Sequence, residues 1–225
     1  MYDGPHSPCT QTFGLGLSRM PGAAEMDEIE SFFRDRGAPA FHEVSSLADK
    51  AMLPLLNERE YRPAELSHVS VLPLAGRAFA AALDDSLRVR VVTGSEREIW
   101  ARTAVEGWRE SADLSNGLEE LMRVMIERND SPCFLVERDG RPIATGGLAV
   151  HEGVALMAGA ATVPEFRRLG AQRLLFESRL QFAADAGCDL AMIVTEPGSA
   201  AQRNAERQGF RIAYSRIKWG RNALV

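Results

Sequence analysis

Residues 154–210 read VALMAGAATVPEFRRLGAQRLLFESRLQFAADAGCDLAMIVTEPGSAAQRNAERQGF and contain the pattern that decides the fold. The pattern predicts a strand, a turn rich in arginine and glycine, a long amphipathic helix, a second apolar strand and a short polar helix. The first N–H groups of a helix have no partner within it, and the helix dipole adds positive potential there. We therefore expect a small anion to bind at the turn, where Arg167, Arg168 and Arg173 add charge.

The turn Arg167-Arg168-Leu169-Gly170-Ala171-Gln172 resembles the R/Q-x-x-G-x-G/A signature of the GCN5-related N-acetyltransferase (GNAT) family. In that family the loop wraps the pyrophosphate of acetyl-coenzyme A, and Gly170 lets the backbone approach the phosphates. The last position differs, because Gln172 stands where the family usually has Gly or Ala. The resemblance implies a cofactor site that comprises Ala161, Val163, Arg167, Arg168, Leu169, Gly170, Ala171, Gln172, Arg173, Asn204 and Arg207.

Composition narrows the choice of ligand. The chain has 225 residues, 45% of them hydrophobic and 25% charged, with a net charge of -5. That charge argues against binding to nucleic acid or to a membrane surface. The three cysteines form no C-x-x-C pair and the four histidines are scattered, so neither a disulfide framework nor a metal site is indicated. With no secretory signal and no run of about 20 apolar residues, a cytoplasmic protein is expected.

The order of elements extends the resemblance over 87–219. Residues 87–93 alternate as a strand, and Ser95 with Glu98 forms a capping box before a first helix. A second helix is predicted around 118–126, followed by strands 133–137 and 142–150 joined at Asp139-Gly140. This order is the one that the GNAT fold uses. It implies an α/β (α+β) fold with a mixed, mostly antiparallel sheet flanked by helices, in which two central strands splay apart.

The first 70 residues repeat part of this order. Segments 32–63 and 181–212 both predict a helix, a glycine, a strand, a turn and a second helix before an aromatic-arginine pair, Tyr61-Arg62 or Phe210-Arg211. We interpret residues 1–70 as a partial, degenerate GNAT-like half without the pyrophosphate loop, 71–86 as a connector that includes a short helix, and 87–225 as the complete acetyl-CoA-binding domain. Chance similarity of two strand-helix units is the alternative.

The resemblance also implies where the chemistry lies. A backbone N–H near Ala161 or Val163 would polarise the thioester carbonyl. Many relatives carry a tyrosine, as acid toward the departing thiolate, where this chain has Ala205; Tyr214, water or no protein group would replace it. The amine must lose a proton before it attacks, and Glu106 and Glu110, with Asp113 and Glu196, are the candidate bases, although a solvated charge explains each of them better than a catalytic role does. Trp100 and Trp108 line the acceptor pocket or pack in the core.

Two classes of function remain open at this point. One is an enzyme that moves an acetyl or other short acyl group from acetyl-CoA to an amine of a small molecule or peptide, by direct attack in a ternary complex. The other is a non-catalytic acyl-CoA-binding or regulatory module. The oligomeric state is also open: the N-terminal half-copy either substitutes for a partner subunit or supplies the surface for a homodimer.

Overall fold

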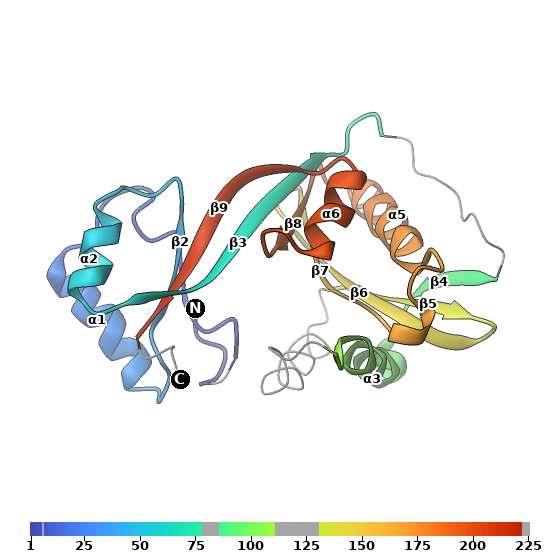
Figure 1. The fold of residues 1–225 in the computed structure, drawn as a ribbon, viewed down its shortest axis with the longest axis horizontal. Coiled ribbons are helices and arrows are strands. Elements are labelled where there is room, and N and C mark those ends of the chain that lie inside the picture. The colour runs from blue at the N-terminus through green and yellow to red at the C-terminus, as the bar shows by residue number, and fades with distance from the viewer. Residues whose placement is uncertain (6, 78–85, 111–130, 222–225) are drawn as a thin grey trace. The chain divides into compact units, whose positions relative to one another are not determined.

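The computed structural model describes residues 1–5, 7–77, 86–110 and 131–221. They form two compact units (Figure 1). Unit 1 comprises residues 1–70, 195–207 and 211–225, and unit 2 comprises residues 71–194 and 208–210. The units differ from the ranges 1–70 and 87–225 expected from the sequence, because unit 1 also includes residues near the C-terminus. These residues contain a strand that pairs with a strand near the N-terminus.

Unit 1 is a sheet with the strand order β1-β2-β9-β3 and three helices. β1 pairs in parallel with β2, and β2 pairs antiparallel with β9. Its elements are β1 (Thr12–Phe13), α1 (Ala23–Arg34), β2 (Phe41–Ser45), α2 (Met52–Glu58), most of β3 (Arg62–Pro73), α6 (Ala200–Arg207) and β9 (Arg211–Gly220). The first residues of the expected connector, 71–73, are instead the end of β3, and the short helix expected in the connector falls mostly outside the described residues.

Helix α1 packs its apolar face into the core of unit 1. Met26 and Phe33 are buried, but Phe32 is exposed and stacks under the guanidinium of Arg36. The helix ends as predicted, because Gly37 adopts a left-handed φ of 66° and the next amide, of Ala38, donates back to the Phe33 carbonyl.

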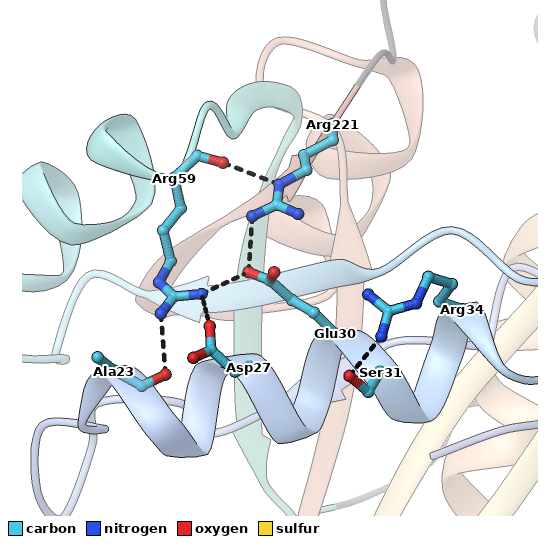
Figure 2. Close-up of polar contacts among 7 residues, drawn as sticks. All are labelled: Ala23, Asp27, Glu30, Ser31, Arg34, Arg59 and Arg221. Atoms are coloured by element: carbon cyan, nitrogen blue, oxygen red, sulfur yellow. Dashed lines mark hydrogen bonds and ion pairs between the residues drawn. The ribbon is translucent and has the colours of Figure 1, made fainter.

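Figure 2 shows the polar network that ties the elements of unit 1 together. Arg59, directly after α2, donates to Asp27 (2.8 Å), Glu30 (3.0 Å) and the Ala23 carbonyl (2.8 Å), all on α1. Arg221, directly after β9, donates to the Arg59 carbonyl and to Glu30, both at 2.8 Å. Because Glu30 is mostly buried, these charge-assisted bonds hold α1 against both neighbours more firmly than exposed ion pairs would.

Unit 2 is a sheet with the strand order β8-β7-β6-β5-β4. β4 to β7 run antiparallel, whereas β7 and β8 are parallel. Helices α3 and α5 cover opposite faces of this sheet (Figure 1). The elements are β4 (Leu87–Val91), α3 (Arg97–Trp108), β5 (Cys133–Arg138), β6 (Arg141–His151), β7 (Val154–Thr162), α5 (Ala171–Asp185) and β8 (Leu190–Thr195). This mixed, mostly antiparallel sheet with helices confirms the expected fold class.

Local turn chemistry explains the connections of unit 2. Asp139 and Gly140 both have positive φ, 51° and 77°, as a two-residue hairpin between β5 and β6 requires. The helix start differs from the prediction, because Thr93 and Glu96 form the capping box of a 3-10 turn, Gly94–Glu96, that leads into α3. The helix predicted around 118–126 lies outside the described residues.

The order α1-β2-α2-β3 in the N-terminal part matches α5-β8-α6-β9 later in the chain. The aromatic-arginine pairs fall at the same point, since Arg62 begins β3 and Arg211 begins β9. The residues before the two aromatics, Glu60 and Gly209, both have positive φ, 63° and 94°. The repeated order therefore agrees with the interpretation of a partial copy. Of the helices in the described ranges, none has the length and apolar character to span a bilayer.

Candidate cofactor site

The turn before α5 leaves the start of this helix open. Arg168 and Gly170 adopt left-handed φ values of 66° and 88°, and Gly170 is the N-cap of α5. The first bond inside the helix runs from the Leu174 amide to the Gly170 carbonyl, so the amides of Ala171, Gln172 and Arg173 precede it. No side chain caps them within the described part of the chain. Such donors, at the positive end of a 15-residue helix, are suited to bind an anion.

The corresponding helix of the N-terminal copy has a closed start. The Glu25 carboxylate accepts a bond from the Gly22 amide (2.8 Å) and pairs with Arg19, so an acidic side chain of the helix itself occupies its N-terminus. The hydrogen bond from Arg19, followed by that from Gly22, lowers the pKa of Glu25 to about 2. α5 has no acidic residue in its first turn. The two helices therefore differ at the point where an anion would bind.

Arg167 belongs to the sequence signature, but its side chain points toward α3. Its guanidinium bonds the Glu110 carboxylate (2.6 Å), the Gly107 carbonyl (3.2 Å) and the Thr162 carbonyl (3.4 Å). Glu110 balances its charge, so Arg167 joins the end of α3 to the end of β7. The charge available to an anion therefore comes from Arg168 and Arg173, which are exposed and form no ion pair with another described residue.

The candidate bases on α3 and directly after it are engaged in ion pairs at the surface. Glu110 pairs with Arg167, and Glu106 lies 3.8 Å from Arg109. Both side chains are accessible to solvent, with exposed fractions of 43% for Glu106 and 57% for Glu110. Gly107 lies between the two glutamates in the sequence and packs tightly on the end of β7, where an added Cβ would lie 3.1 Å from the Thr162 nitrogen. Both glutamates are therefore close to the end of β7.

The backbone donor assigned by resemblance requires a correction. The Val163 amide donates to the Ile143 carbonyl of β6 at 2.9 Å, so it is not available to a ligand. Because N–H directions alternate along a strand, the Ala161 amide points toward β6 as well, and the Thr162 amide points away from it. The N–H of Thr162 therefore points to the edge of β7 that lies opposite β6. Sequence reasoning missed it because the alternation is set by pairing with a distant strand.

The pairing between β7 and β8 ends before β7 does. The resemblance to the GNAT family implies that the pantetheine arm of the cofactor binds at this point. Their parallel ladder runs from Val154↔Leu190 to Met157↔Ile193, whereas β7 continues to Thr162 paired with β6. Gln172, which departs from the signature, has a role at this point: its side-chain amide donates to the Thr162 hydroxyl at 2.6 Å and joins the first turn of α5 to the end of β7. The Gln172 side chain is therefore held against β7, next to the first turn of α5.

Both tryptophans of α3 donate hydrogen bonds to the sheet. Trp100 is fully buried, and its indole N–H lies 3.0 Å from the Phe134 carbonyl and 3.3 Å from that of Gly146. The indole N–H of Trp108 donates to the Ala160 carbonyl at 3.1 Å. Packing against β5, β6 and β7 is therefore the role the structure supports for both, rather than a lining of the acceptor pocket.

The sequence analysis also missed Arg179. It lies on the buried face of α5 with Leu175, Phe176 and Leu180, and has no accessible surface. Burial lowers its pKa to about 9, so it remains charged at neutral pH. A lone arginine at a position where the helical period calls for an apolar residue was the available signal.

Three of the remaining predicted residues, Asn204, Arg207 and Tyr214, belong to unit 1, whereas Asp113 lies outside the described residues. Asn204 and Arg207 lie on α6, where the Arg207 guanidinium donates to the Asn204 side-chain oxygen at 2.9 Å. Ala205, at the position of the family tyrosine, is buried. Tyr214 lies on β9 and is partly buried. Among the described residues, no three His, Cys, Asp or Glu side chains lie close enough to hold a metal ion.

The separation of β7 from β8, the glycine turn and the uncapped start of α5 form the arrangement that the resemblance to the GNAT family implies. The model of the Acetyltransferase (GNAT) family matches residues 97–210, about half of the chain, and the protein belongs to this family. No protein of curated function matches the sequence.

Solved structures share the fold over most of the chain. A GCN5-related N-acetyltransferase from Kribbella flavida has a TM-score of 0.70 at 19% identity, over 88% of this chain and 74% of its own. A GCN5-related N-acetyltransferase from Sphaerobacter thermophilus has a TM-score of 0.65 at 16% identity, with 90% and 67% covered. A tandem GNAT protein from the clavulanic acid biosynthesis pathway has a TM-score of 0.67 at 11% identity, with 90% and 70% covered. The tandem relative is consistent with the partial N-terminal copy.

Proposed function

We propose that the protein transfers an acetyl or other short acyl group from acetyl-CoA to an amine of a small molecule or peptide, by direct attack in a ternary complex. The observation that carries the proposal is the uncapped start of α5, where the amides of Ala171, Gln172 and Arg173 precede the first bond of the helix. These donors, with the charges of Arg168 and Arg173, hold the diphosphate. Family membership supports the same assignment.

In this proposal the acyl-pantetheine arm lies along β7 after Met157, where β8 is no longer paired with it. The Thr162 amide, directed away from β6, donates to the thioester oxygen and stabilises the negative charge that develops there. The amine nitrogen bonds to the carbonyl carbon, the carbon–sulfur bond breaks, and the electron pair leaves with the thiolate. The amine proton passes to water or to a carboxylate, for which Glu106 on α3 and Glu110, two residues after α3, remain the candidates.

A non-catalytic acyl-CoA-binding module is the second candidate. It is favoured by the buried Ala205 at the position of the family tyrosine and by the ion pair that engages Glu110. Release of free thiol from acetyl-CoA, measured across a panel of amines, distinguishes the two functions. An enzyme gives turnover that depends on the amine, whereas a binding module is stabilised thermally by CoA without releasing thiol.

Calorimetry with matched arginine variants tests the phosphate site. Arg173→Ala is expected to weaken CoA binding by about 1–3 kcal/mol, because it removes a charge-assisted bond to phosphate. Arg34→Ala, in the exposed last turn of α1, is the control and leaves the affinity unchanged. Equal CoA affinity in wild type, Arg173→Ala and Arg168→Ala would count against the assignment of the loop.

A further inference from the structure

β7 contains a bulge directly after its ladder with β8 ends. Between the register pairs Thr145↔Ala161 and Gly147↔Ala158, one residue of β6 faces two of β7. Ala158 is the first residue beyond Met157, the last β7 residue paired with β8. The bulge therefore lies at the branch point from which β7 continues alone toward Thr162.

The buried guanidinium of Arg179 holds this branch point. Its Nη1 donates to the carbonyls of Gly147 and Ala158, both at 3.3 Å, and its Nε donates to the Leu175 carbonyl at 3.2 Å. On the opposite face, the Trp108 indole donates to the Ala160 carbonyl. The carbonyl groups of the bulge thus receive side-chain donors from α5 and from α3.

Gly146 provides the space for the guanidinium. A Cβ at this position would lie 3.1 Å from Cζ and Nη1 of Arg179 and 2.9 Å from a methyl group of Leu175. Such contacts are tighter than side chains tolerate without a shift. The glycine in β6 and the arginine in α5 therefore form a matched pair beneath the bulge.

Stability alone does not account for a charge in this place. Arg179 has no carboxylate partner among the described residues, and its Nη2 makes no hydrogen bond to any of them. Its partners are backbone carbonyls and the Phe176 ring, 5.4 Å from Cζ. Burying a charge without an opposite charge is costly, and apolar residues of similar volume often stabilise a core at least as well. The feature that an apolar side chain could not supply is the set of hydrogen bonds to the bulge.

We propose that Arg179 is a positioning residue for acyl transfer: by holding the Ala158 and Gly147 carbonyls, it fixes the bulge that directs the Thr162 amide toward the thioester oxygen. The inference rests on the proposed function. According to this inference, Arg179 contributes to the chemical step and not to the binding of CoA. CoA binding and chemistry should therefore respond differently when Arg179 is replaced.

The test compares Arg179→Met with Arg138→Met, the same change at the half-buried last residue of β5. In the free protein, hydrogen exchange of the segment 158–163 should accelerate in Arg179→Met only. With acetyl-CoA labelled with ¹³C at the carbonyl, infrared difference spectra should show the bound carbonyl stretch returning toward its frequency in water. The affinity for CoA should stay unchanged while kcat falls by about 100-fold, as for a misplaced catalytic group.

Unchanged exchange, carbonyl frequency and kcat in Arg179→Met would overturn the proposal. If that variant does not fold, Gly146→Ala displaces the guanidinium without removing it and is held to the same expectations, and Arg179→Lys should recover part of the lost kcat. Wild-type protein that does not bind CoA would refute the proposed function instead. The exchange measurement on the free protein would still decide whether Arg179 fixes the bulge.

Discussion

His42 is expected to make the stability of the protein depend on pH. It lies on β2 with no accessible surface, and its Nδ1 is 2.9 Å from the Thr12 hydroxyl. The Tyr61 ring packs on it at 4.5 Å between centroids. Burial, reinforced by the positive charges of Arg221 and Arg59 and opposed by Glu30, lowers the pKa of His42 from 6.5 to about 4. The folded protein therefore keeps this imidazole neutral at pH values where the unfolded chain protonates it.

The sign and size of the effect follow from this difference. Above pH 6.5 His42 is neutral in both states and contributes no pH dependence. As the pH falls from 6.5 toward 4, the unfolded chain binds a proton that the folded protein does not, so stability is lost. At about 1.4 kcal/mol for each pKa unit, the loss reaches about 3 kcal/mol near pH 4.

Urea unfolding followed by circular dichroism between pH 7 and pH 4 measures this loss. His42→Asn removes the titrating group and should flatten the curve by about 3 kcal/mol relative to wild type. His151→Asn is the matched control, because His151 lies at an exposed turn with 88% of its side chain accessible. The reasoning would be refuted if His42→Asn kept the pH dependence of wild type, or if the control flattened it equally.

Three further outcomes are expected. Gly170→Ala places a Cβ on a residue with a φ of 88° and should lower the free energy of unfolding by about 1–2 kcal/mol and weaken CoA binding. Gly94→Ala, at a position with open space and ordinary φ, should do neither. Equal effects of the two variants in calorimetry and urea unfolding would show that the left-handed turn is unimportant. Gly107→Ala forces α3 away from β7 and should destabilise by about 1–3 kcal/mol, and an unchanged unfolding midpoint would contradict the close approach. Trp108→Phe leaves the Ala160 carbonyl without its donor and should cost about 1–2 kcal/mol in urea, and a loss near zero would remove this bond from the account.

Local patterns predicted the parts of the fold that depend on neighbouring residues. Strand 190–195 and the hairpin at Asp139-Gly140 follow from apolar runs and turn residues, and both are confirmed. The capping box before α3 was predicted two residues late, because Thr93 with Glu96 and Ser95 with Glu98 are overlapping sequence patterns. In the structure the box of Thr93 and Glu96 forms, because a 3-10 turn precedes α3.

Features that depend on distant pairing could not be read in this way. The first half of β3 carries an exposed, largely polar sequence, and in the strand order of unit 1 it stands beside β9, which is far along the chain. The direction of the Thr162 amide is likewise fixed by the bond from Val163 to Ile143 of β6. The role of Arg179 depends on its position under a bulge in another strand. Family resemblance supplied the site residues, but the structure decides which atoms of each remain available.

Calorimetric titration with CoA and with pantetheine, which has the same thiol arm but no diphosphate, tests the central claim most directly. The account predicts that CoA binds and that pantetheine, without a group for the open start of α5, binds much more weakly or not at all. Equal affinity for the two compounds, or no heat from CoA at millimolar concentration, would contradict it.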